Sequence, residues 1–289
     1  VSVVGTRESD IVNIGGIVGY SGFSTLSNCS NTGAVSAENA DYVYAGGVMG
    51  QSINTTLSGC YNNGAVSAQN VEEANLGGLV GQSSEDTAVS SCYNTGAVSA
   101  ENAVYVKLGG VVGENRSDSV ISSYNTGDVT TENVEDVYAG GVVGYNDGTV
   151  SNCNNTGDVG TKDVTYAAVG GVVGENDDAV SNCYNTGDVS AKASSGASAG
   201  DSVMAGGVAG YNSSGTVTDC YNTGDVSVQV NSGAGTGEGY PPVMAGGVVG
   251  KVHKGTVSNC YSIGTVSGEN TEGASVGGVA GYKDSGDVT

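Results

Sequence analysis

The chain has 289 residues, including 51 glycines but only two prolines and no tryptophan, and its formal net charge at pH 7 is −22. The glycines follow no Gly-X-Y period, which excludes collagen, and a hydrophobic content of 38% argues against a disordered chain. A surface this acidic repels phosphate groups, so the sequence predicts neither a nucleic-acid partner nor docking on anionic lipid.

A pair of glycines recurs along the chain at a nearly constant interval of about 31 residues. The pairs begin at Gly15, Gly46, Gly77, Gly109, Gly140, Gly170, Gly206, Gly246 and Gly277. This period predicts stacked units, each unable to bury its apolar face alone. We therefore expect one solenoid domain over residues 1–289. Both ends fall within a repeat, so we also expect the chain to be part of a longer protein.

Each unit contains short Val-rich runs bounded by Gly, Asn, Asp and Ser, a pattern typical of strands. In the fifth unit the expected strands cover residues 138–143, 149–153 and 158–159, and the expected turns cover 144–148 and 155–157. Glycine supplies the positive φ that such turns need. The sequence thus predicts an all-β β-solenoid of about nine coils, with roughly 31 residues and three short strands per coil.

One cysteine recurs at the same place in almost every unit, and Ser123 replaces it once. The column comprises Cys29, Cys60, Cys92, Cys153, Cys183, Cys220 and Cys260. The odd number and the lack of CxxC pairs argue against a zinc site and against complete pairing in disulfides. We expect a ladder of buried thiols, with disulfides between neighbouring coils as the alternative.

An asparagine follows two positions after the cysteine, on the same expected inner side of the coil. The column comprises Asn31, Asn62, Asn94, Asn125, Asn155, Asn185 and Asn222. Stacked amides can hydrogen-bond along a rod, so this column is predicted to be structural.

The position between the cysteine and the asparagine is usually tyrosine and is expected to point outward. This column comprises Tyr61, Tyr93, Tyr124, Tyr184, Tyr221 and Tyr261. An outward aromatic column can stack on sugar rings or on a partner protein. The alternative is that the rings pack on one another or against a turn.

Two units carry insertions, near residues 191–203 and 229–243, that are expected to project from the same corner of neighbouring coils. Loops on a rigid scaffold often carry function, so Tyr240 in the second insertion is a further candidate for contact with a partner. Insertions without a role are the alternative.

An aspartate occupies one position in four successive units, at Asp128, Asp158, Asp188 and Asp225. Carboxylates stacked at about 4.8 Å would repel one another, and calcium bound between them would relieve the repulsion. The alternative is an exposed turn in which water and salt screen the charges. Calcium is the single candidate metal, and no other cofactor is expected.

Residues suited to catalysis are scarce. His253 is the only histidine, Arg7 and Arg116 are the only arginines, and no nucleophile–base set has credible spacing. No apolar stretch approaches the length of a membrane span. The sequence therefore predicts neither an enzyme nor insertion into a membrane.

The residues Gly78-Leu79-Val80-Gly81 and their Gly-Val-Val-Gly counterparts, followed by Cys-Tyr-Asn-Thr-Gly, resemble the GLUG motif of bacterial surface proteins. Proteins with this motif include large secreted or wall-attached polypeptides. Among them are immunoglobulin A1-specific metalloproteases, whose repeats lie outside the catalytic domain. The HExxH zinc motif of those proteases does not occur in this sequence.

The resemblance implies an extracellular or cell-surface location, flanking domains, and a role in adhesion or spacing. We expect a stalk or presentation scaffold, with direct adhesive binding of glycans or host proteins as the alternative.

Overall fold

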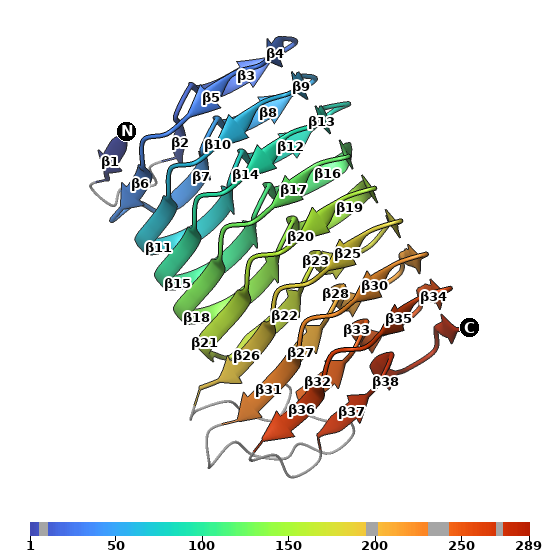
Figure 1. The fold of residues 1–289 in the computed structure, drawn as a ribbon. Helices are drawn as coiled ribbons and strands as arrows, with labels where there is room; N and C mark the ends of the chain where they lie inside the picture. The colour runs from blue at the N-terminus through green and yellow to red at the C-terminus, as the bar shows by residue number, and fades with distance from the viewer. Residues whose placement is uncertain (6–10, 195–201, 231–242, 270–273) are drawn as a thin grey trace.

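The computed structural model describes residues 1–5, 11–194, 202–230, 243–269 and 274–289. In these residues parallel strands stack coil upon coil from the N-terminal to the C-terminal end (Figure 1). The described part of the chain contains no helix. The predicted all-β solenoid is confirmed, with about eight turns of roughly 31 residues each.

The first sheet has 15 strands and contains the longest strands of the molecule. Its strands are β1 (Ser2–Val4), β2 (Ile11–Gly15), β6 (Val35–Glu38), β7 (Tyr42–Gly46), β11 (Val66–Gly77), β15 (Val98–Gly109), β18 (Val129–Gly140), β21 (Val159–Val164), β22 (Tyr166–Gly170), β26 (Val189–Ala193), β27 (Val203–Gly206), β31 (Val226–Val230), β32 (Val243–Gly246), β36 (Val266–Glu269) and β37 (Ser275–Gly277).

The second sheet has 16 strands. They are β3 (Val18–Gly22), β4 (Thr25–Ser27), β8 (Met49–Ile53), β9 (Thr56–Ser58), β12 (Val80–Ser84), β13 (Ala88–Ser90), β16 (Val112–Ile121), β19 (Val143–Ser151), β23 (Val173–Asn176), β24 (Ala179–Ser181), β28 (Ala209–Asn212), β29 (Thr216–Thr218), β33 (Val249–Val252), β34 (Thr256–Ser258), β38 (Ala280–Lys283) and β39 (Asp287–Val288).

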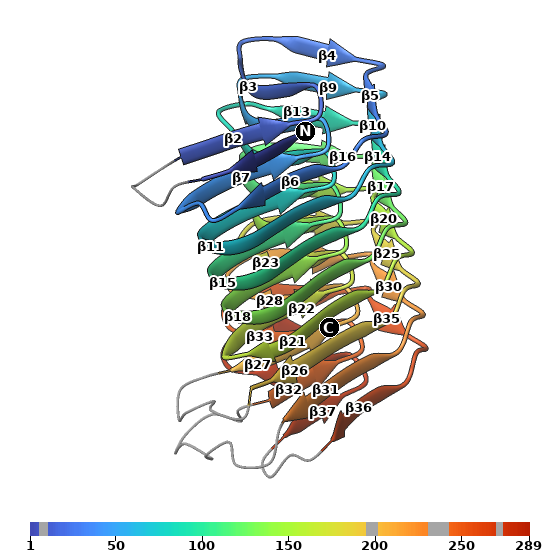
Figure 2. The same cartoon turned by 90° about the vertical axis from the view of Figure 1, so that its left-hand side faces the viewer.

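The third sheet consists of eight two-residue strands that form a column along one edge of the rod (Figure 2). They are β5 (Ser30–Asn31), β10 (Tyr61–Asn62), β14 (Tyr93–Asn94), β17 (Tyr124–Asn125), β20 (Asn154–Asn155), β25 (Tyr184–Asn185), β30 (Tyr221–Asn222) and β35 (Tyr261–Ser262). Equivalent residues of successive coils face one another in all three sheets, as Val98 faces Val129 and Tyr93 faces Tyr124.

The glycine pair forms the corner between the first and second sheets. A Cβ atom at Gly109 would lie 1.9 Å from the carbonyl oxygen of Val112, and one at Gly110 would lie 2.1 Å from that of Gly141 in the next coil. Both close contacts are with backbone atoms, so no change of side-chain rotamer could relieve them. Glycine is therefore required here for the turn and for the stacking of the coils.

This corner corrects the expected strand boundaries. The strand predicted over residues 138–143 is broken, because β18 ends and β19 begins on either side of the Gly-Gly corner. The turn predicted over residues 144–148 is also wrong in this coil, where β19 runs straight through it. The strand predicted to begin at residue 158 begins at Val159. In three coils the strand that follows this turn does not end there but continues into the first strand of the next coil, which gives the long strands β11, β15 and β18. Each bends at an asparagine of positive φ, such as Asn133 (φ 54°).

Two separate apolar cores flank the corner. Val137 and Ala139 of β18 belong to one cluster of buried residues, and Val143 and Val150 of β19 belong to the other. Between these two clusters, side chains that belong to neither, such as Tyr138 and Tyr145, meet across the corner.

The asparagine column lies in the interior, as predicted. Asn125 has no exposed surface, and its Nδ2 atom donates to Oδ1 of Asn155 at 2.8 Å and to the carbonyl of Gly127 at 2.6 Å. Its Oδ1 atom accepts from Nδ2 of Asn94 at 2.8 Å. Because the second glycine of most pairs adjoins this column, as Gly110 adjoins Asn125, the two features depend on each other.

A second asparagine ladder runs through the second sheet and was missed by the sequence analysis. Asn115, Asn146, Asn176 and Asn212 are fully buried and connect amide to amide at 2.7, 2.8 and 2.9 Å. A recurring Gly-x-Asn after the Gly-Gly corner was the available signal.

Candidate functional site

The tyrosine column lies on the outer face of the third sheet. Tyr61, Tyr93 and Tyr124 stack face to face, with successive ring centroids 5.0 Å apart and ring planes within 5° of parallel. The rings therefore point outward, as predicted, but they also cover one another's faces. The column presents mainly ring edges to solvent, and its role in ligand binding stays a prediction.

A second stack contains Tyr184, Tyr221 and Tyr261, with centroids 5.0 and 5.3 Å apart. Asn154 stands between the two stacks and pairs in register with Tyr124 on one side and Tyr184 on the other. The column is thus two stacks of three rings with one rung between them that carries no ring.

The aspartate column binds backbone amides of neighbouring coils. Oδ1 of Asp128 accepts from the backbone N–H of Asp158 at 3.1 Å, and Oδ1 of Asp158 accepts from that of Asp188 at 2.9 Å. The same bond joins Asp188 to Asp225 at 2.9 Å. Across the residues that the structure describes, no group of three or more His, Cys, Asp or Glu side chains could hold a metal ion.

We expect these hydrogen bonds to stabilise the column without calcium, so that EDTA leaves the melting temperature unchanged. Asp158→Asn keeps an acceptor and removes one of the repelling charges, so it should keep or raise the melting temperature. Thermal melts followed by circular dichroism, with EDTA and with added CaCl₂, check both expectations. A melting temperature that rises with calcium, and does so less in Asp158→Asn, would instead support a calcium site.

The cysteines form the predicted thiol column. All seven are free thiols, and all but Cys29 and Cys260 are buried. The backbone N–H of Cys183 donates to Sγ of Cys220 at 3.4 Å, while Sγ of Cys183 donates to the carbonyl of Ser181 at 3.1 Å. The hydrogen bond to the Cys153 thiol, with burial, raises the pKa of Cys183 to about 12.

An alkylating agent must reach the sulfur atom to react, so burial should protect the interior thiols of this column. With iodoacetamide at pH 8 we expect Cys29 and Cys260 to be modified first. Cys153, Cys183 and Cys220 should react as fast as these two cysteines only after the protein has been denatured. Mass spectrometry of peptides from timed samples measures each rate, and equal rates in the native protein would contradict the buried column.

A family model described as the GLUG motif matches five segments in the N-terminal coil and the C-terminal half of the chain: residues 12–36, 136–160, 165–190, 201–227 and 243–267. The chain carries GLUG repeats. Comparison with curated proteins and with solved structures found no match.

Each GLUG match corresponds to most of one coil. The match over residues 136–160 begins within β18, includes the glycine corner, β19 and β20, and ends within β21. The GLUG glycines are therefore the corner glycines, and each match ends within the next strand of the first sheet.

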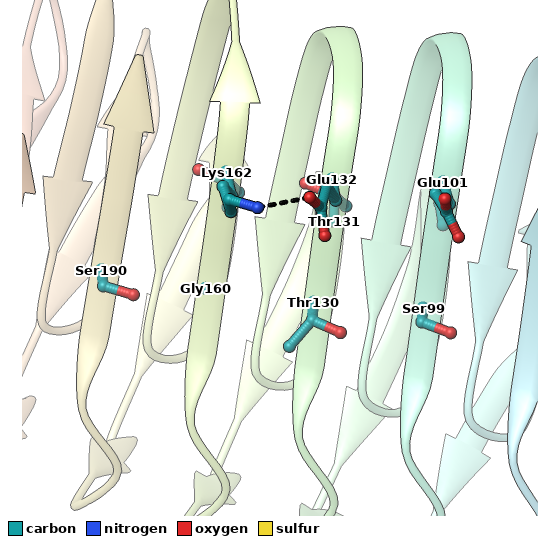
Figure 3. Close-up of a pocket in the computed structure, with 10 residues that line it drawn as sticks. Ser99, Glu101, Thr130, Thr131, Glu132, Gly160, Lys162 and Ser190 are labelled. Carbon is teal, nitrogen blue, oxygen red and sulfur yellow. Dashed lines mark hydrogen bonds and ion pairs between the residues drawn. The ribbon is translucent and has the colours of Figure 1, made fainter. Parts of the chain in front are cut away.

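The outer face of the first sheet carries the hollow shown in Figure 3, with a volume of about 400 Å³. A row of hydroxyl side chains crosses neighbouring coils at Ser99, Thr130 and Ser190, and Gly160 leaves a gap in the row. Beside the gap, Lys162 forms an ion pair with Glu132. The hollow is open and shallow, and its charges are already paired in part.

Another set of tyrosines lies where the first and second sheets face each other; we call it the tyrosine seam. Its members occupy three in-register rows and are Tyr20, Tyr42, Tyr44, Tyr105, Tyr138, Tyr145, Tyr166, Tyr211 and Tyr282. The rings of Tyr138 and Tyr145, on opposite sides of one glycine corner, are 6.1 Å apart. The seam was not predicted, because its tyrosines recur at three positions of the repeat, none of them beside a cysteine, and alternate there with other residues.

A buried ion-pair network lies within the seam. Nζ of Lys107 lies 2.5 Å from Oε1 of Glu114, which also lies 3.0 Å from Nε of Arg116. The ammonium group is 5.3 and 4.9 Å from the ring centroids of Tyr105 and Tyr145, within cation–π range. Burial raises the pKa of Glu114, but the ion pairs, first that with Lys107, outweigh it and the pKa is lowered.

Glu175 in the same seam is predicted to make stability depend on pH. Burial, followed by the nearby Asp177, raises the pKa of Glu175 to about 7 from an ordinary 4.5. A carboxyl group with a raised pKa in the folded state opposes folding once ionised, so stability should fall as pH rises from about 4.5 through 7. We expect Glu175→Gln to abolish this loss, which is on the order of 3 kcal/mol.

Chemical denaturation at pH 5 and pH 8 measures this effect. The two proteins should be similarly stable at pH 5, and Glu175→Gln should be the more stable at pH 8. Equal free energies of unfolding for the two proteins at both pH values would contradict the raised pKa of Glu175.

The single histidine is paired. Nδ1 of His253 lies 2.7 Å from Oδ2 of Asp284, one coil further along the chain. Ser285 lies next to this pair, but its hydroxyl donates to the backbone carbonyl of His253. The pair was predictable from the period, since residues one repeat apart are neighbours in a solenoid.

The two insertions begin later than predicted. Ala191–Ala193 still belongs to β26, and residues 229–230 still belong to β31. The candidate Tyr240 lies outside the described residues, as does most of both insertions. The described residues include no helix long and apolar enough to cross a membrane.

Proposed function

We propose that this chain is a non-catalytic repeat module that serves as a stalk or presentation scaffold in adhesion. The supporting observation is its continuous stacking: the main path of each sheet passes through successive coils in chain order without interruption. Each added coil lengthens such a rod by about 4.8 Å. An array of this kind sets a distance by its number of repeats.

Contacts between coils favour a stiff rod. Amide, thiol and tyrosine columns each join neighbouring coils, so bending would have to open several ladders at once. The net charge of −22 keeps rods apart in solution by repulsion. We therefore propose that flanking domains of a longer protein are its partners.

We propose an extracellular location at a bacterial cell surface. The support is the GLUG repeats, because the proteins that the sequence resembles are secreted or wall-attached. Buried thiols are compatible with that environment, since most of them are shielded from oxidants.

Direct binding of glycans or host proteins is the second candidate function. It is favoured by the outward tyrosine column, in which Tyr124 is 37% and Tyr261 is 53% exposed. Exposed aromatic rings are common in surfaces that bind sugars and proteins.

Binding of the purified chain to an array of mucosal glycans and extracellular host proteins distinguishes the two functions. The scaffold role predicts no saturable binding by a chain that melts cooperatively. Saturable binding that is lost in Tyr124→Ala or Tyr261→Ala, with an unchanged melt, would contradict a purely mechanical role and establish the second function.

A further inference from the structure

The rung at Asn154 leaves a gap in the tyrosine column. Asn154 pairs with Tyr124 and Tyr184 in neighbouring coils, so these rings lie two rungs apart, or about 10 Å. The opposite face of each ring is already covered, by Tyr93 and by Tyr221. One face of Tyr124 and one of Tyr184 are therefore directed toward the rung of Asn154, whose short side chain carries no ring to cover them.

The gap has the thickness of one flat group. Each continuous stack holds a ring 5.0–5.3 Å from its neighbour, so a planar guest at the Asn154 rung would meet both faces at that spacing. Solvent reaches both rings that border this rung, since Tyr124 is 37% exposed and Tyr184 is half-buried.

The electrostatics of the gap favour a cation. Aromatic faces carry partial negative charge and attract cations within about 6 Å. The same three coils carry the exposed carboxylates Asp128, Asp158 and Asp188, each four residues after the column position. The net charge of −22 adds long-range attraction for a basic partner.

We propose that the gap binds the guanidinium group of an arginine side chain on a protein partner, sandwiched between Tyr124 and Tyr184. Guanidinium is flat, always charged and weakly hydrated, whereas the ammonium group of lysine is compact and strongly hydrated. This site rests on the second candidate function, direct binding through the tyrosine column, and deepens it by assigning a ligand to one rung of the rod.

Three short peptides test the two properties of the ligand separately. Acetyl-Gly-Arg-Gly-amide is flat and charged, the citrulline analogue is flat and neutral, and the lysine analogue is charged but not flat. We expect the arginine peptide to bind roughly fivefold or more tightly than either analogue. Its side-chain protons should shift upfield in NMR titrations, because they enter the ring currents of two tyrosines.

Two variants test the location. Asn154→Tyr fills the gap and should abolish the upfield shifts. Tyr221→Asn opens an equivalent gap between Tyr184 and Tyr261 and should raise the stoichiometry from one site to two. Tyr261→Asn is its matched control, because it removes a terminal ring without creating a gap and should leave one site.

Melting curves confirm that each variant is folded. Equal binding of the arginine and citrulline peptides would overturn the proposal, as would unchanged binding to Asn154→Tyr or a single site in Tyr221→Asn. Tighter binding of 4-methylphenol or methyl glucoside in the same titration would also overturn it, because the gap would then prefer a neutral ring.

Discussion

Alanine in place of Gly110 is expected to destabilise the chain by more than about 4 kcal/mol. The added Cβ would lie 2.1 Å from the carbonyl oxygen of Gly141 in the next coil and 2.3 Å from Cγ of Asn125. The backbone contact cannot be relieved by a change of rotamer, so the coils would have to separate. Chemical denaturation followed by circular dichroism measures the change.

Gly278 supplies the matched control. It occupies the same place in the last pair of glycines, and a Cβ there would have no neighbour within 4 Å. Gly278→Ala should change the free energy of unfolding by less than about 1 kcal/mol. A similar loss in both variants would show that the glycine matters for the turn itself rather than for the stacking of coils.

Removal of the Asn125 side chain is expected to cost about 4 kcal/mol. Asn125→Ala leaves the amide of Asn94, the amide of Asn155 and both backbone groups of Gly127 without their present partner. These groups are buried, and each unsatisfied one costs about 1–3 kcal/mol. Because the stability of a solenoid depends on contacts between neighbouring coils, the coils before Asn125 and those after it should also melt at different temperatures.

The adjacent Asn154 provides a control of the same chemistry. It lies one residue from the column of buried amides but points outward and is only half-buried, so Asn154→Ala should cost less than about 1 kcal/mol. Calorimetry of the two variants makes the comparison. A single cooperative transition near the original temperature in Asn125→Ala would contradict a structural role for the ladder.

The period and the residue columns were predictable from the sequence because both follow from repetition. One residue in each repeat stacks on its equivalent in the next, so the column of Asn125 and Asn155 and the column of Cys153 and Cys183 could be inferred without knowing the path of the coil. The outward direction of Tyr124 followed from alternation along a strand.

The corners were not predictable in the same way. Residues 138–143 have the composition of a strand, and they turn where the backbone approaches both itself, at Gly140, and the next coil, at Gly141. The tyrosine seam depends on that corner, since Tyr138 and Tyr145 meet only because the chain reverses between them. Asn154 is visible in the sequence as an exception in the tyrosine column. The proposed site could be recognised only from the structure, which shows rings stacked on both sides of this rung.

The stiffness of the rod tests the proposed scaffold most directly. Fluorophores attached to a cysteine introduced at Ser30 in β5 and to one introduced at the exposed Ile263, directly after β35, with the native thiols replaced by serine as at Ser123, report the distance between the first and last coils of the third sheet. A stiff rod should give one narrow single-molecule energy-transfer distribution that is unchanged by EDTA. A broad or multiple distribution in a folded chain would contradict a stalk that holds its neighbours at a fixed distance.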